Sequence, residues 1–173
     1  MMILVGPSAS GKTEVAQVLI EKFNMEKMVT YTTRPMRVGE VNHVSYHFIS
    51  KEEFLELKNN DEFVETALYN GNFYGTRKCD VKPQKIVILE PSGLKIFKEK
   101  MKEKVTSFYL IASENIRRGR MRRRQDSEEE INKRLINDRL VFNNVEGVDY
   151  YIDNEDININ ELAKKIYNIY KGE

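Results

Sequence analysis

The sequence is poor in the residues that build disulfide frameworks, multi-cysteine metal sites and membrane spans. Its 173 residues include one cysteine, Cys79, which excludes an internal disulfide framework and a multi-cysteine zinc site. No apolar run approaches the ~20 residues that cross a bilayer. The N-terminal stretch has neither the basic start nor the cleavage site of a secretory signal. We therefore expect a cytoplasmic protein that has no membrane partner.

Net charge is also small, because 28 Lys and Arg face 27 Asp and Glu, which leaves +1. This balance argues against a surface built throughout for nucleic acid. Charge is unevenly distributed in one segment, where a cationic run, Arg117–Arg124, is followed directly by the acidic Asp126 and Glu128–Glu130. Such a run is typical of a nucleic-acid stripe or of a lid over phosphates. No aromatic residue interrupts it, and its acidic neighbours would repel a polyanion, so we favour the lid.

Short apolar runs alternate with helical patterns along most of the chain. Buried strands are predicted at residues 3–5, 85–89, 106–111 and 149–152. Helices are expected from Thr13, near residue 51, after Ser127 and at the C-terminus, two of them opened by capping boxes. Strands that alternate with helices predict a three-layer α/β/α fold around a central parallel sheet. Residues 31–75 break the pattern with a hairpin signal at Asn70–Asn72, which predicts a small, partly β insertion.

The segment Gly6–Thr13 satisfies the phosphate-loop pattern G-x-x-x-x-G-K-[ST] between a predicted strand and a predicted helix. The glycines let backbone N–H groups curve around a triphosphate, Lys12 reaches the β- and γ-phosphates, and the Thr13 hydroxyl ligates Mg²⁺. A glycine-rich turn with an incidental lysine is the alternative, and the strand–loop–helix context argues against it. The ATP-binding candidates in this loop are Gly6, Ser8, Ala9, Ser10, Gly11, Lys12 and Thr13.

Four further blocks follow in order: Thr32–Asn42, Tyr46–Phe48, Glu62–Glu65 and Gly71–Thr76. Together with the phosphate loop and the later arginines, their order and spacing resemble the guanylate kinase family over nearly the whole chain. The resemblance implies a P-loop nucleoside-monophosphate kinase that transfers the γ-phosphoryl group of ATP to GMP or dGMP with Mg²⁺. It also implies small-molecule substrates, no nucleic-acid partner, and a monomer or homodimer.

The resemblance assigns roles that suit the chemistry of the side chains. Arginine forks match a phosphate monoester. The carboxylate of Glu65 can accept hydrogen bonds from guanine N1–H and the 2-amino group, which adenine lacks. Taken singly, each of these residues could equally be an ordinary surface or core residue. The implied GMP-binding set is Thr30, Arg34, Arg37, Tyr46, Glu65, Tyr74, Thr76 and Glu90.

The arginine run resembles the mobile lid of this kinase family. The resemblance places Arg123 and Arg134 where arginines stabilise the transferring phosphoryl group, and it makes Lys12 and Arg34 the other catalytic candidates. It also brings Asn154 near the adenine of ATP. The chain then divides into a core (1–30, 76–115 and 136–173), a monophosphate-binding insertion (31–75) and a lid (116–135).

Three departures from the family pattern carry structural expectations. Ala9 stands where the loop usually has glycine, and alanine fits there if its φ is negative. The segment 76–85 is several residues shorter than in the family and contains Pro83, so a loop is expected in place of the family's helix. Only Glu90 stands where the family has two aspartates. Glu90 could therefore serve either the metal or the monophosphate.

Two other functions stay open at this point. A P-loop kinase for another nucleotide or for a sugar phosphate such as ribose 1,5-bisphosphate would have no use for Glu65, Thr30 and Thr76. A guanylate-kinase-like module that binds phosphorylated peptides without catalysis would usually lose the phosphate loop, whereas Lys12 and Thr13 are intact here.

Overall fold

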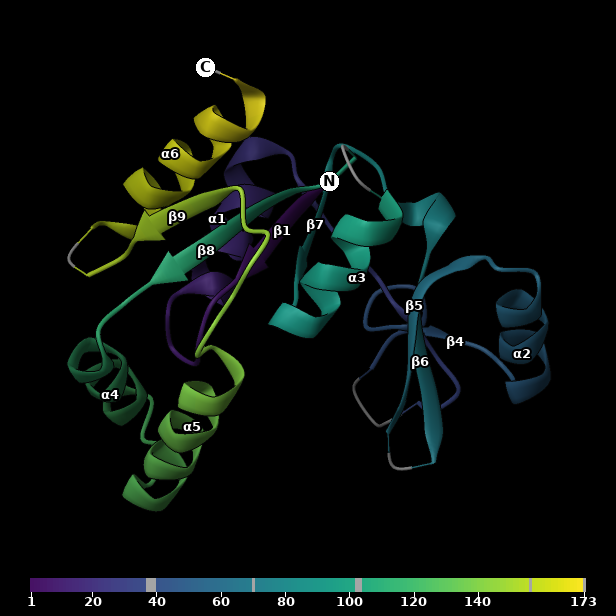
Figure 1. Cartoon of the computed structure of the whole chain (residues 1–173), viewed down its shortest axis with the longest axis horizontal. Coiled ribbons are helices and arrows are strands. Elements are labelled where there is room, and N and C mark those ends of the chain that lie inside the picture. The colour runs from purple at the N-terminus through teal and green to yellow at the C-terminus, as the bar shows by residue number, and fades with distance from the viewer. Residues whose placement is uncertain (37–39, 70, 102–103, 156, 173) are drawn as a thin grey trace.

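A parallel five-stranded sheet forms the centre of the protein (Figure 1). The computed structural model describes residues 1–36, 40–69, 71–101, 104–155 and 157–172. The strand order is β2-β7-β1-β8-β9, with every pair parallel. The strands are β1 (Met2–Val5), β2 (Glu26–Lys27), β7 (Lys85–Ile88), β8 (Thr106–Ile111) and β9 (Tyr150–Asp153). Because β1 is the middle strand, the segment that follows it lies at the centre of the sheet's carboxyl edge.

Alternate residues of β1 face two separate cores. Met2 and Leu4 pack with α1 (Lys12–Phe23) and α6 (Ile159–Lys171), whereas Ile3 and Val5 pack with α3 (Pro91–Met101) on the opposite face. This arrangement confirms the predicted three-layer α/β/α fold. The helix α3 was not predicted, and it begins at Pro91. Proline is tolerated in the first turn of a helix, where its missing N–H has no partner to lose.

A second, four-stranded sheet lies beside the core, in the order β4-β3-β6-β5. Its strands are β3 (Tyr31–Thr32), β4 (His47–Phe48), β5 (Phe63–Tyr69) and β6 (Asn72–Arg77), and β5 and β6 form the predicted hairpin. The helix α2 (Lys51–Asn59) covers the outer face of this sheet, where Phe54 stacks on Phe63 at 4.5 Å and on Phe73 at 5.3 Å between ring centroids. Ser50 caps α2 by accepting the N–H of Glu53 at 3.0 Å.

Two helices carry the arginine-rich segment, α4 (Glu114–Arg123) and α5 (Glu128–Val141). They meet through a small apolar cluster of Met121, Ile131 and Leu135. The capping box predicted at the start of α5, between Ser127 and Glu130, is present. One of the acidic residues beside the arginine run, Glu128, pairs with two arginines of α4.

Between β6 and β7 the chain forms only a three-residue 3-10 turn, Lys78–Asp80, as the short spacing predicts. Among the described residues, no helix is both long enough and apolar enough to cross a membrane.

Candidate active site

The phosphate-loop motif joins β1 to α1, and its two glycines are required by the space around them. Gly11 has φ +99°, and a Cβ there would lie 2.3 Å from Nδ2 of Asn154. Gly6 has φ +149°, and a Cβ there would lie 2.7 Å from the carbonyl oxygen of Leu110. A side chain at position 6 would therefore require a shift of the backbone, whereas one at position 11 would displace the Asn154 side chain and strain the backbone at its positive φ.

Ala9 corrects one expectation from the sequence. Its φ is +58°, in the left-handed region, rather than negative. An alanine in this conformation costs roughly 1–2 kcal/mol because its Cβ crowds the following carbonyl group. The Ala9 side chain also packs against the cluster of Met121, Ile131 and Leu135, which offsets part of that cost.

Lys12 points back onto its own loop. Its Nζ donates to the carbonyl oxygens of Gly6 at 2.6 Å and Pro7 at 2.8 Å. Burial lowers the pKa of Lys12 to about 8, although Asp138 and Glu14 favour its charged form. The ammonium is thus held on neutral acceptors that a phosphate oxygen can replace.

Asn154 and Arg120 brace the loop from outside. Nδ2 of Asn154, whose residue is 2% exposed, donates to the carbonyl oxygen of Ser10 at 2.8 Å. Arg120 donates to the carbonyl oxygens of Ala9 at 3.2 Å and Asn154 at 2.6 Å. The sequence singled out Asn154 for another role, near adenine, and did not single out Arg120.

Strand alternation gathers predicted acceptor-binding residues on one face of the second sheet. Glu65, Tyr74 and Thr76 lie on the face opposite α2, because Phe63 and Phe73 occupy the α2 side. The Thr76 hydroxyl donates to Oε1 of Glu65 at 2.9 Å, and Thr76 is 1% exposed. Burial raises the pKa of the Glu65 carboxyl, and the hydrogen bond from Thr76 opposes that shift. The result is a partly desolvated acceptor with few competitors for its lone pairs.

Arg34 sits among aromatic rings at the edge of this face. Its guanidinium lies 5.6 Å from the ring centroids of both Tyr46 and Phe48, and Tyr46 packs edge-on to Tyr74 at 6.1 Å. Arg34 also forms an ion pair with Glu40 at 2.6 Å, which raises the pKa of Arg34. The Arg34 guanidinium thus lies close to the rings of Tyr46 and Tyr74 and is held by the carboxylate of Glu40. The predicted Arg37 lies outside the described residues.

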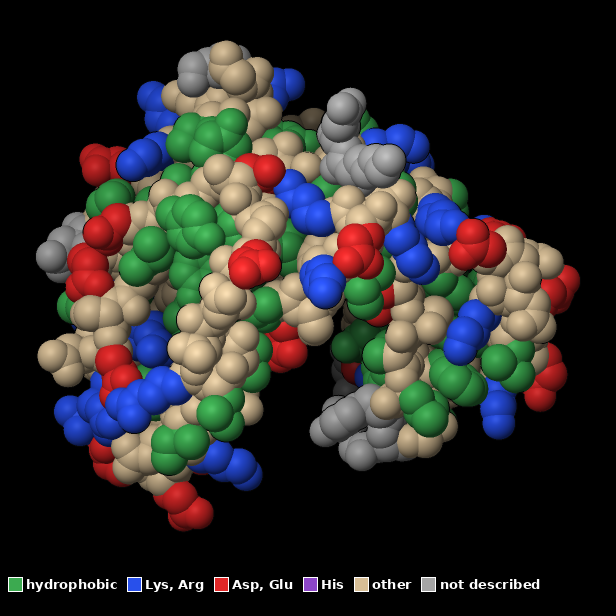
Figure 2. Space-filling model, viewed as in Figure 1, with side chains coloured by type: hydrophobic (Ala, Val, Ile, Leu, Met, Phe, Trp, Pro, Cys, Tyr) green, Lys and Arg blue, Asp and Glu red, His purple; other side chains and the backbone are tan. Residues whose placement is uncertain are grey.

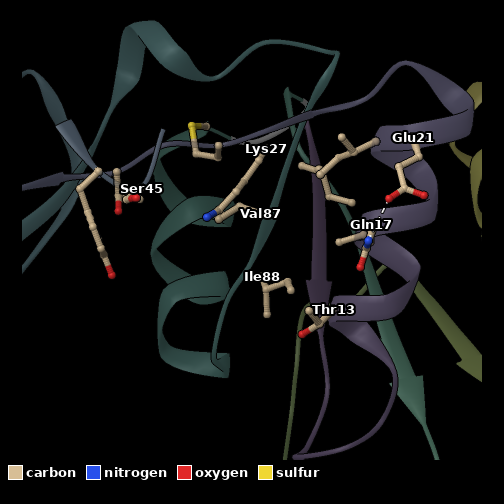
Figure 3. A pocket seen from close by; sticks show the side chains of 13 residues that line it. Thr13, Gln17, Glu21, Lys27, Ser45, Val87 and Ile88 are labelled. Atoms are coloured by element: carbon tan, nitrogen blue, oxygen red, sulfur yellow. Dashed lines mark hydrogen bonds between the residues drawn. The ribbon is translucent and has the colours of Figure 1, made fainter. Parts of the chain in front are cut away.

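A cavity of about 440 Å³ lies between α1, the end of β7 and the second sheet. Thr13, Thr30 and Tyr46 line it, so three predicted site residues from distant segments meet there. Figure 3 shows Thr13 and Gln17 on α1 across from Ser45, with Lys27 reaching between them. Figure 2 shows the hollow between the two lobes of the molecule. Glu90 is exposed and follows β7, at the same carboxyl edge of the sheet as the phosphate loop.

A second cavity of about 320 Å³ opens on the other side of the loop. Gly11, Asn154 and three arginines of the cationic run, Arg120, Arg123 and Arg124, line it. Arg124 is paired with Glu14, whereas Arg123 has no carboxylate partner within the described part of the chain. The predicted Arg134 lies apart from this cavity. It is half exposed and 3.5 Å from Asp126.

Three residues with contacts to the site were not singled out as site residues from the sequence: Glu40, which pairs with Arg34, and Arg117 and Asp138, which contact the loop. The last two are buried, with 6% and 4% of their surface exposed, and they form an ion pair at 2.6 Å. Charged residues are rarely buried unless they are paired. Nothing in their local sequence distinguishes them from the exposed charges around them.

Comparisons with known proteins find relatives that cover the whole chain. The family model described as guanylate kinase matches residues 1–170. The guanylate kinase of Anaplasma phagocytophilum (strain HZ) is 36% identical, over 100% of this chain and 86% of that protein. The guanylate kinase of Clostridioides difficile (strain 630) is also 36% identical, over 100% of this chain and 87% of that protein. The crystal structure of the Anaplasma phagocytophilum guanylate kinase matches with a TM-score of 0.69 at 31% identity, covering 99% of this chain and 84% of that chain.

Proposed function

The chain belongs to the guanylate kinase family, and from that premise we propose how its residues transfer the γ-phosphoryl group of ATP to GMP. The observation that supports the proposal is twofold: Glu65, Tyr74 and Thr76 share the face of the second sheet opposite α2, and Thr30 and Tyr46 line one cavity together with Thr13 of the intact phosphate loop. One side of the hollow suits a guanine monophosphate, and the other suits a triphosphate.

The acceptor is held by its base and by its phosphate. Glu65 accepts hydrogen bonds from guanine N1–H and the 2-amino group, while Thr76 fixes its carboxylate and Thr30 adds a hydroxyl nearby. Arg34 binds the monophosphate together with Tyr46, Tyr74 and Arg37. Supporting this role, the rings of Tyr46 and Phe48 hold the Arg34 guanidinium. The same contacts serve dGMP as well as GMP.

The donor is held by the phosphate loop. Backbone N–H groups of the loop and the N-terminus of α1 bind the triphosphate. Lys12 moves from its carbonyl acceptors to the β- and γ-phosphates. Arg123 and Arg134, carried on the lid (116–135), neutralise charge that develops on the moving group. Arg123 is the better placed of the two in this structure, because it lines the cavity beside Gly11.

The residues at the sheet edge fit Mg²⁺. This ion binds few protein oxygens and keeps water and phosphate ligands, so it does not require an all-protein cage. The exposed hydroxyl of Thr13 and the exposed carboxylate of Glu90 supply hard oxygen donors. Within the described residues no group of three acidic, histidine or cysteine side chains forms a closed metal site, which accords with such a partial shell. Bound there, Mg²⁺ neutralises phosphate charge.

The reaction needs no covalent intermediate. The GMP phosphate oxygen attacks the γ-phosphorus of ATP in line, and the bond to the ADP oxygen breaks. Positioning and electrostatic stabilisation supply the catalysis. We place this reaction in the cytoplasm, with the chain acting as a monomer or homodimer divided into core, insertion and lid.

The direct test is ADP release from Mg·ATP by the purified protein with GMP, dGMP, AMP, CMP, UMP and ribose 1,5-bisphosphate as acceptors. We expect turnover with GMP and dGMP, and none above background with the other four. Turnover that is fastest with AMP or ribose 1,5-bisphosphate would overturn the guanine-binding role of Glu65. Omission of Mg²⁺ should abolish the reaction, since the triphosphate charge is then left uncompensated.

A further inference from the structure

The buried ion pair between Arg117 and Asp138 joins the start of the lid to the core segment that follows the lid. Arg117 lies near the start of α4, and Asp138 lies three turns along α5. Their Nη1 and Oδ2 atoms are 2.6 Å apart, and their side chains are only 8% and 5% exposed. Removing two charges from water is costly unless they also satisfy other polar groups. The contacts of this pair therefore indicate what it is for.

All three polar groups of Ser8, in the phosphate loop, bond to this pair. The Ser8 N–H donates to Oδ2 of Asp138 at 3.0 Å, and its hydroxyl donates to Oδ1 at 3.0 Å. The Ser8 carbonyl oxygen accepts from Nη1 of Arg117 at 3.3 Å. One loop residue is thus fixed by two helices that lie 109 and 130 positions away in the sequence.

The charges of the pair cancel close to where a triphosphate binds. An unpaired carboxylate at Asp138 would repel the phosphates, whereas the neutral pair presents only its hydrogen-bonding geometry. Asp138 still favours the charged form of Lys12, together with Glu14 and against Arg117 and Arg124. Arg117 also contributes to lowering the pKa of Glu114, and the two members of the pair act in opposite directions on the pKa of Tyr109 on β8. The pair therefore supports the loop through its hydrogen bonds, and its carboxylate alone favours the charged form of Lys12.

We propose that Arg117 and Asp138 are positioning residues that fix the phosphate loop for ATP and anchor the base of the lid to it. The proposal deepens the ATP-binding role given to the loop and rests on that function. Because α4 and α5 are tied to Ser8 at this point, closure of the lid moves the parts beyond the anchor, including Arg123, rather than the anchor itself.

Two double variants test the hydrogen bonds without leaving a buried charge unpaired. R117M/D138N and R117M/D138L remove both charges, and Asn and Leu have nearly the same shape. Asn can still accept the Ser8 N–H, and Leu cannot. We expect kcat/KM for Mg·ATP to be about tenfold lower in the Leu variant than in the Asn variant, the size of one lost hydrogen bond to a buried donor. The KM for GMP should stay within about twofold in both, because the second sheet is untouched.

Asp149 provides a matched control. It accepts the N–H of Ser107 at 2.7 Å and the Ser107 hydroxyl at 2.8 Å, and it pairs with Lys98. Ser107 lies level with Ile3 in the sheet, away from the loop. D149N should lower the denaturant midpoint while leaving both KM values and kcat unchanged.

Equal kinetic constants for the two double variants would overturn the proposal, since the pair would then only fill space. If R117M/D138L does not fold, Ser8→Ala supplies the comparison, because it removes one bond to Asp138 and leaves the ion pair intact. We expect about a threefold loss of kcat/KM for Mg·ATP in S8A, and an unchanged value overturns the proposal. Loss of GMP turnover in the unmodified chain would instead overturn the kinase function itself, so the two failures are distinguishable.

Discussion

Glu65→Gln should move stability and activity in opposite directions. The carboxylate of Glu65 is partly desolvated, and burial raises its pKa, so its charged form is disfavoured in the folded chain. A neutral amide of the same shape removes that cost and can still accept the Thr76 hydroxyl, now 2.9 Å from Oε1. We expect the free energy of unfolding at neutral pH to rise by about 0.5–2 kcal/mol, the usual gain when a functional residue is replaced by a better-tolerated one.

The same substitution should lower kcat/KM for GMP. One amide oxygen remains on Thr76, which turns the NH₂ group toward the N–H groups of guanine. One charge-assisted hydrogen bond is lost, at about 1.5–3 kcal/mol, and a donor faces a donor, at about 1–3 kcal/mol more. The sum corresponds to a loss of roughly 10²–10⁴ in kcat/KM for GMP.

Coupled ADP-release kinetics and urea unfolding at pH 7 measure the two quantities on one preparation. The KM for Mg·ATP serves as the internal control, because Glu65 lies on the acceptor side. If E65Q keeps its kcat/KM for GMP within threefold of the unmodified chain, Glu65 does not read the base and the reasoning fails. The stability difference should also shrink as the pH falls through the raised folded-state pKa of Glu65 and vanish below its ordinary value of 4.5, since residue 65 is then neutral in both proteins, folded and unfolded.

Three further predictions concern Lys12, Ala9 and Arg34. Because the pKa of Lys12 is lowered to about 8, kcat/KM for Mg·ATP should fall as the pH rises through 8, and a pH profile that stays flat to pH 10 would contradict this. In the unfolded chain Lys12 has its ordinary pKa of 10.5, so between pH 8 and 10.5 the unfolded chain binds one more proton than the folded chain. Lys12 therefore makes the free energy of unfolding rise with pH over this range. The variant Lys12→Met should remove this rise. Ala9→Gly should raise the free energy of unfolding by about 1 kcal/mol, measured in urea, because glycine relieves the left-handed backbone at φ +58°; destabilisation would mean that the methyl packing outweighs the strain. Arg34→Lys keeps the charge but loses the planar fork, so the KM for GMP should rise about 10–100-fold while the KM for Mg·ATP stays constant.

Much of the fold could be predicted because its signals are local. The motif Gly6–Thr13 needs only a preceding strand and a following helix, and both are present as β1 and α1. The capping box at Ser127 and the turn signal at Asn70–Asn72 act over four residues or fewer, and each is followed by the predicted element. Strand order could not be read in the same way, because it depends on pairing between distant segments.

The unpredicted features depend on contacts far apart in the sequence. The short strand β2 (Glu26–Lys27) exists only because it pairs with β7, and both of its residues are exposed, so no apolar pattern marks it. The left-handed conformation of Ala9 is imposed by the path of the loop and not by any local preference of alanine. The burial of Asp138 depends on Ser8, 130 positions away. Within an exposed arginine-rich stretch, no sequence pattern distinguishes the few buried charged residues from the exposed ones.

Three cations of the site, Lys12, Arg34 and Arg124, already have acceptors within the chain, and these limit how much free energy a bound phosphate can gain from them. Arg34 is paired with Glu40, and Arg124 with Glu14, so a phosphate must displace or share a carboxylate at each of them. Lys12 rests on neutral carbonyl oxygens, which a phosphate replaces with net electrostatic gain. Arg123 forms no ion pair among the described residues, so in the proposed mechanism its full charge would act on the transferring group. Interactions that must be exchanged add little to ground-state affinity, whereas an unpaired arginine brought in by the proposed lid closure would stabilise mainly the transition state.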